Sequence, residues 1–118
     1  MINGAHVIAY SQDAQADRAF LSDVLGFAGV DAGDGWLILK LPPAEIAVHP
    51  TDGKARHELY LMCDDIEKTL GELTAKGVEI SRPVRDEGWG LLASIELPGG
   101  SDLGLYEPRH PVAYDLDQ

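Results

Sequence analysis

A pattern of one strand, one helix and several strands occurs twice along the chain, and this repeat limits the possible folds more than any other feature. In the first copy, the spacing of apolar residues predicts a strand at 5–10 and a helix at 14–25. In the second copy the matching strand falls at 58–63 and the helix at 65–76, an offset of about 51–52 residues. Each copy alone is too small to bury a core, so we expect the two copies to pack together.

Residues typical of helix ends flank both predicted helices. Asp13 precedes the first helix, and Asp64 with Glu67 resembles a capping box at the start of the second. Gly26 and Gly77 follow the two helices, where glycine commonly ends a helix. The two helices therefore have defined starts and ends in the sequence.

Several further strands complete the predicted domain. They fall at 36–41 and 45–49 in the first copy, and at 78–81, 91–97 and 103–107 in the second. The length of 118 residues fits a single domain. The sequence therefore predicts one α+β domain with a first module at about 4–50, a second at about 56–110 and a C-terminal tail at 111–118.

Charge and composition limit the binding partners and the cellular compartment that we expect. The chain has 20 acidic and 9 basic side chains and a formal net charge of −11. Nucleic acids and anionic membranes would repel such a protein, so we expect neither as a partner, whereas a neutral or cationic small molecule is allowed. No apolar run approaches the roughly 18–20 residues that span a bilayer, and the first residues do not resemble a secretory signal. Because Cys63 is the single cysteine, no internal disulfide can form, and we expect a cytoplasmic protein.

Three segments carry the pattern of a known family. They are His6-Val7-Ile8-Ala9 with Asp13, Phe20 and Leu25-Gly26-Phe27; residues 58–78; and Pro98-Gly99-Gly100-Ser101 with Leu103 and Leu105. Together they resemble the vicinal oxygen chelate superfamily, which includes glyoxalase I, the bleomycin and fosfomycin resistance proteins and the extradiol dioxygenases. The resemblance implies two βαβββ modules that form one curved, cup-shaped mixed sheet, with helices outside and a ligand site inside. It also implies a homodimer.

The resemblance further implies a metal site with ligands from both modules. The candidate ligands in this chain are His6, Glu58, Glu45 and His49. The last family position falls on Gly104, which has no side chain to bind a metal, and Glu107 is predicted to face away because side chains alternate along a strand. A mixed imidazole and carboxylate set suits a divalent transition metal, here Ni²⁺, Zn²⁺, Mn²⁺ or Fe²⁺.

The same alternation of side chains predicts the lining of the cup. The predicted ligand-binding residues are His6, Tyr10, Trp36, Tyr60, Met62, Trp89, Ser94 and Tyr106. Glu58 and Glu96 are the predicted catalytic residues, because a carboxylate can carry a proton to or from a substrate. A mainly aromatic and apolar lining with a few acids is typical of a small-molecule site.

The sequence leaves two functions open. The first is metal-assisted lyase or isomerase chemistry of the glyoxalase type, with a degenerate metal site. The second is a metal-free binding protein that sequesters a drug or a planar metabolite through aromatic contacts. His6 favours the first and Gly104 favours the second, and the incomplete ligand set makes dioxygenase chemistry the least expected outcome.

Overall fold

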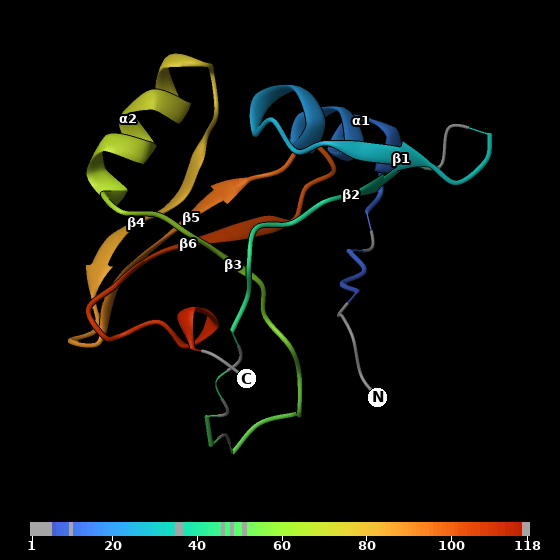
Figure 1. The fold of residues 1–118 in the computed structure, drawn as a ribbon. Coiled ribbons are helices and arrows are strands. Elements are labelled where there is room, and N and C mark those ends of the chain that lie inside the picture. The colour runs from blue at the N-terminus through green and yellow to red at the C-terminus, as the bar shows by residue number, and fades with distance from the viewer. Residues whose placement is uncertain are drawn as a thin grey trace.

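The computed structural model describes residues 6–9, 11–34, 37–45, 47, 49–50 and 52–116 (Figure 1). In chain order its helices and strands are α1 (Ala14–Ala19), η1 (Phe20–Val24), β1 (Gly29–Asp31), β2 (Leu37–Leu39), β3 (Tyr60–Met62), α2 (Ile66–Ala75), β4 (Ile80–Asp86), β5 (Gly90–Glu96), β6 (Asp102–Pro108) and η2 (Ala113–Asp115). η1 is a π-helix that continues α1, and η2 is a short 3-10 helix.

The second module has the predicted order of one strand, one helix and three strands. Its strands form a four-stranded sheet in the order β3-β6-β5-β4, in which β3 runs parallel to β6 and the other neighbours are antiparallel. α2 begins after Asp65, whose side chain accepts a hydrogen bond from the backbone N–H of Lys68. The cap is therefore one residue later than the predicted Asp64.

The first module keeps its predicted helix and part of its predicted sheet. Asp13 caps α1 by accepting a hydrogen bond from the N–H of Ala16, and α1 with η1 covers almost the whole predicted helix. β2 lies within the predicted strand at 36–41. It pairs antiparallel with β1, which the sequence analysis did not predict, in a separate two-stranded sheet.

Two strand predictions in the first module are wrong for the residues that the structure describes. Neither residues 6–9 of the predicted strand at 5–10 nor the described residues of 45–49 lie in a strand. Alternating apolar residues form a strand only where a neighbouring strand takes up their backbone hydrogen bonds. Val7 and Ile8 are instead 51% and 63% exposed, because the segment lies outside both sheets.

The expected α+β class is confirmed, and the four-stranded sheet is open and uncurled (Figure 1). Apolar residues of η1 pack against the same buried cluster as α2, so both helical segments cover one face of the sheet. The Lys76 ammonium also lies 3.5 Å from the carbonyl oxygen of Val24, which joins the ends of the two helical segments.

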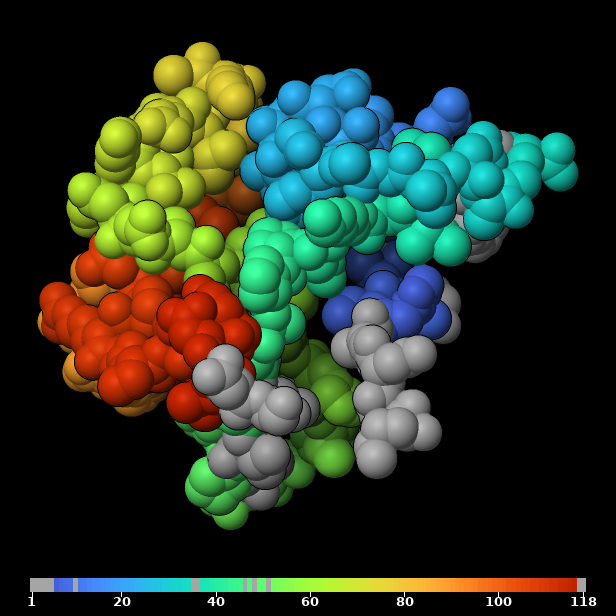
Figure 2. Space-filling model, viewed as in Figure 1, coloured from blue at the N-terminus to red at the C-terminus, as the bar shows by residue number. Residues whose placement is uncertain are grey.

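The hairpin of β1 and β2 projects from the rest of the molecule (Figure 2). No helix in the described part of the chain has the length and apolar character needed to cross a bilayer.

The core lies between α2 and the strands β5 and β6. Its buried members are Ile66, Leu70 and Leu73 of α2, Val78, and Ala93, Ile95, Leu97, Leu103 and Leu105 from the strands and the turn between them. Outside this cluster, the Asp17 carboxylate is buried and accepts a hydrogen bond of 2.7 Å from the N–H of Gly99. That bond ties α1 to the turn between β5 and β6.

Removing a core side chain should destabilise the protein far more than removing a similar one at the surface. Ile95 is fully buried between α2 and the sheet, so we expect Ile95→Ala to lower the free energy of unfolding by about 2–5 kcal/mol. Ile80 of β4 is 41% exposed, and Ile80→Ala is the matched control with an expected loss below about 1.5 kcal/mol. Urea denaturation measures both, and equal losses would contradict the placement of the core.

Candidate functional site

The face of the four-stranded sheet opposite α2 carries two tyrosines, and we call it the tyrosine face. Leu103 and Leu105 of β6 pack under α2. Gly104 lies between them in the strand and Tyr106 follows Leu105, so both lie on the opposite face. The strand register aligns two rows of residues there. One row contains Ser94, Gly104 and Tyr60, and the next contains Leu92, Tyr106 and Met62.

Two glycines make room for the two tyrosine rings. The Tyr60 ring lies over Gly104, where a Cβ atom would overlap the ring. A Cβ atom on Gly90 would lie 2.9 Å from Cε1 of Tyr106, so the Tyr106 ring lies over Gly90. The two rings meet edge to face with centroids 6.3 Å apart, an arrangement that aromatic pairs favour. The glycines therefore decide where the aromatic surface of this face lies.

Trp89 extends the aromatic surface from the turn between β4 and β5. Its ring centroid lies 5.4 Å from that of Tyr106, and the residue is 41% exposed. Asp86 holds the turn by accepting hydrogen bonds from the N–H of Gly88 and from the Arg109 side chain, both of 2.8 Å. These two donors lower the pKa of Asp86 below its ordinary value. The backbone N–H of Arg109 also donates to the carbonyl oxygen of Trp89, which ties the turn to the chain that follows β6.

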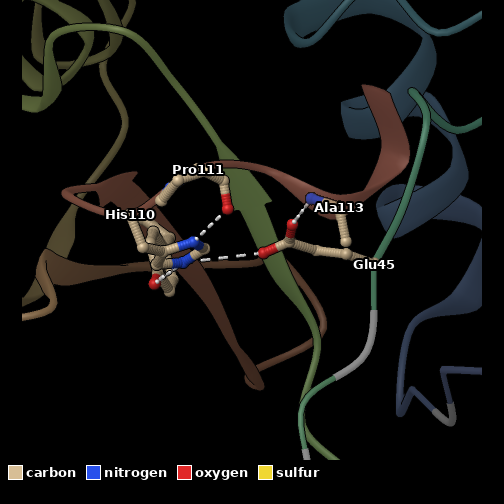
Figure 3. Close-up of polar contacts among 5 residues, drawn as sticks. Glu45, His110, Pro111 and Ala113 are labelled. Atoms are coloured by element: carbon tan, nitrogen blue, oxygen red, sulfur yellow. Dashed lines mark hydrogen bonds and ion pairs between the residues drawn. The ribbon is translucent and has the colours of Figure 1, made fainter. Parts of the chain in front are cut away.

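A polar group borders the aromatic surface where the chain leaves β6 (Figure 3). The Tyr106 hydroxyl lies 2.5 Å from Nε2 of His110, and Nδ1 of His110 lies 2.7 Å from the carbonyl oxygen of Pro111. Glu45 reaches the same place from the first module. One of its oxygens accepts a 2.8 Å hydrogen bond from the N–H of Ala113, and the other lies 3.7 Å from Nε2 of His110.

The environment of Tyr106 keeps its hydroxyl protonated. Burial raises the pKa of Tyr106, and the nearby negative charge of Glu45 raises it further. The oxygen of a neutral phenol at this position can accept a hydrogen bond from a ligand while its ring offers apolar surface. The site is therefore chemically suited to hold a molecule that has both a flat apolar part and a polar group.

Comparison with known proteins places this fold in a family. A family model described as the Glyoxalase/Bleomycin resistance protein/Dioxygenase superfamily matches residues 5–108, which is most of the chain. The chain belongs to this superfamily. The match agrees with the resemblance found in the sequence. No curated protein matches the sequence.

Solved structures from the superfamily and its relatives have the same fold. An antibiotic-binding protein, TnmS3 from Streptomyces sp. CB03234, is 22% identical with a TM-score of 0.60, over 88% of this chain and 99% of that one. A lactoylglutathione lyase from Agrobacterium tumefaciens is 15% identical with a TM-score of 0.64, over 89% of this chain and 92% of that one. A superfamily member from Sphaerobacter thermophilus DSM 20745 is 22% identical with a TM-score of 0.59, over 90% and 98% of the two chains. At these low sequence identities the similarity shows a shared fold only.

Members of the superfamily often bind divalent metals, but the candidate ligands of this chain do not converge in the structure. His6 is exposed outside any strand. Glu58 is also exposed, and its carboxylate lies 3.9 Å from the Arg56 guanidinium. Glu45 is engaged by Ala113 and His110 as described above. Among the described residues, no three His, Cys, Asp or Glu side chains are arranged to hold a metal, so the residues present do not fit one and we assign no step to it.

The other predicted site residues fall into three groups. Tyr60, Met62, Ser94 and Tyr106 occupy the two rows of the tyrosine face, and Trp89 borders them. His49, a predicted metal ligand, lies against Trp89 with ring centroids 5.7 Å apart. Tyr10 and Trp36 lie outside the described residues.

Glu96 lies away from the aromatic surface. Its strand register places it four residues along β5 from Leu92, the partner of Tyr106, which is roughly 13 Å in an extended strand. It borders an open cavity of about 340 Å³ between η1, the end of α2 and the start of β4. A second open cavity of about 330 Å³ lies on the hairpin of β1 and β2. Neither cavity is lined by the tyrosines or Trp89.

The sequence analysis gave His110 no role in the site, whereas the structure places it in contact with Tyr106 and Glu45. One signal in the sequence was available. His110 follows Tyr106 by four residues, and the intervening Pro108 ends β6, so a turn can bring the imidazole back over the ring. The ring centroids of the two residues are 5.7 Å apart, which agrees with such a turn.

Neutralising Glu45 should change the titration of Tyr106. Because the charge of Glu45 adds to the effect of burial, we expect Glu45→Gln to lower the Tyr106 pKa, while burial keeps it above the ordinary tyrosine value. The ultraviolet absorbance of the phenolate, measured against pH and corrected with Tyr106→Phe, follows this titration. Glu58→Gln is the control and should leave it unchanged. An unchanged Tyr106 pKa in Glu45→Gln would show that the two residues are not close in solution.

Proposed function

We propose that this protein binds a small organic molecule with a flat apolar part on the tyrosine face. The observation that carries the proposal is the contact of Tyr60, Tyr106 and Trp89, whose rings form one aromatic surface beside a polar group. Aromatic rings supply large contact areas at low entropic cost and favour other flat rings. The binding would therefore depend on stacking and on a few hydrogen bonds.

Two further observations support this function. Trp89 is 41% exposed, so part of the aromatic surface is open to contact with a ligand. The superfamily includes proteins that bind small molecules, and a protein of the same fold is described as antibiotic-binding. We take sequestration of a drug or a planar metabolite as the leading form of this function.

The second candidate function is metal-assisted lyase or isomerase chemistry. It is supported by membership of the superfamily and by the likeness in fold to a lactoylglutathione lyase. It requires the predicted ligands, His6 and Glu58 with Glu45 or His49, to come together in an arrangement other than the one described. Glu58 and Glu96 are the proton carriers that it would use.

We further propose a homodimer, as the sequence resemblance implies. Val7, Ile8 and Val30 are large apolar residues that are each more than half exposed, and a second copy could cover them. Light scattering in solution measures the mass, and a monomer at all concentrations would refute this proposal. The cytoplasmic location stays a prediction.

Removing the indole should weaken the binding of flat apolar molecules. We expect Trp89→Ala to reduce the affinity for 2-methoxynaphthalene about tenfold, because one of the three ring contacts is lost. Tyr114 is 38% exposed in η2 and makes none of the ring contacts found among the described residues. Tyr114→Ala is therefore the matched control with unchanged affinity. Calorimetry measures both, and an equal loss in both variants would contradict the proposal.

Titration with Ni²⁺, Zn²⁺, Mn²⁺ and Fe²⁺ separates the two candidate functions. We expect no stoichiometric binding that depends on His6 and Glu58, because the two side chains are exposed and Glu58 faces Arg56. Calorimetry of the unmodified protein and of His6→Ala and Glu58→Gln provides the measurement. Stoichiometric binding of one metal that both substitutions abolish would favour the second function.

A further inference from the structure

The tautomer of His110 is fixed by its neighbour. Nδ1 of His110 lies 2.7 Å from the carbonyl oxygen of Pro111. A carbonyl oxygen can only accept a hydrogen bond, so Nδ1 must carry a proton. In the neutral imidazole the other nitrogen, Nε2, is then an acceptor.

This tautomer fixes the direction of the next hydrogen bond. The Tyr106 hydroxyl lies 2.5 Å from Nε2 of His110, and Nε2 has no proton to give. The hydroxyl must therefore donate its proton to His110. The phenol has only this one proton, so its oxygen can only accept a hydrogen bond from any further partner.

Glu45 adds more acceptors at the same place. One carboxylate oxygen accepts from the N–H of Ala113, and the other lies 3.7 Å from Nε2 of His110. An ionised carboxylate has no proton to donate. At the polar end of the aromatic surface, Tyr106 and Glu45 therefore offer a ligand acceptor oxygens and no donor hydrogen.

From this arrangement we propose that the natural ligand carries a hydrogen-bond donor, an O–H or N–H group, at the edge of its flat apolar part. The inference rests on the proposed function and specifies the ligand class for that site. Phenols and aromatic amines or amidines match it. Aromatic ethers lack the donor, and aromatic carboxylates would in addition meet the charge of Glu45.

Two neutral probes with the same ring system test the inference. 2-Naphthol carries an O–H donor, and 2-methoxynaphthalene has a methyl group in place of that proton. We expect the unmodified protein, at mildly alkaline pH where histidine side chains are ordinarily neutral, to prefer 2-naphthol. Calorimetry gives the ratio of the two affinities, and the same ratio is measured in each variant, so that the intrinsic difference between the probes cancels.

Removal of the acceptor oxygen should remove the preference. In Tyr106→Phe we expect the affinity ratio to fall about fivefold relative to the unmodified protein, the effect of one hydrogen bond. In His110→Phe the ratio should also fall, because the freed Tyr106 hydroxyl can donate to the ether oxygen. Tyr114→Phe, which removes an exposed hydroxyl outside the aromatic surface, should leave the ratio unchanged.

The outcomes distinguish this inference from the function on which it rests. Binding of both probes with a ratio that is the same in the unmodified protein, Tyr106→Phe and His110→Phe overturns the donor inference and leaves the proposed function standing. Binding of neither probe overturns the proposed function and this inference with it. A fall of the ratio in both variants but not in Tyr114→Phe supports both.

Discussion

The pairing of β5 with β6 decides what each face of the sheet can do. Over seven residue pairs this antiparallel ladder runs without a bulge, from Gly90 opposite Pro108 to Glu96 opposite Asp102. Because side chains alternate, a shift of one residue would exchange the buried leucines under α2 with Gly104 and Tyr106. The apolar core therefore fixes the register, and the register places the aromatic residues on the other face.

The same register governs the position on β6 to which the sequence resemblance assigns a metal ligand. At the position where the sequence resemblance implies a metal-binding glutamate, Gly104 lies beneath the Tyr60 ring. Glu107, three residues further along β6, faces α2, and its carboxylate accepts a 2.9 Å hydrogen bond from the N–H of Ile66. A glutamate side chain at residue 104 and the Tyr60 ring would occupy the same space. In this chain the ring occupies that space.

Much of the second module could be predicted from the sequence, and much of the first could not. Local signals were sufficient for both helices, although the second cap is Asp65 rather than the predicted Asp64, since caps and apolar stripes lie within a few residues of one another. A strand depends on a distant partner, so the pattern at 5–10 gave the wrong result for residues 6–9. The contacts of Glu45 with His110 and Ala113 could not be predicted for the same reason. They join residues that are at least 65 positions apart in the chain.

That long-range contact links the two modules through the ligand site. Glu45 comes from the first module, whereas Tyr106 and His110 belong to the second module, so the polar end of the proposed site is complete only while the segment with Glu45 lies against the C-terminal residues. Trp89 also contacts the first module, through the ring of His49. A ligand that binds only to the assembled site stabilises that assembly by mass action. Binding at the proposed site would therefore be coupled to the packing of the first module on the second.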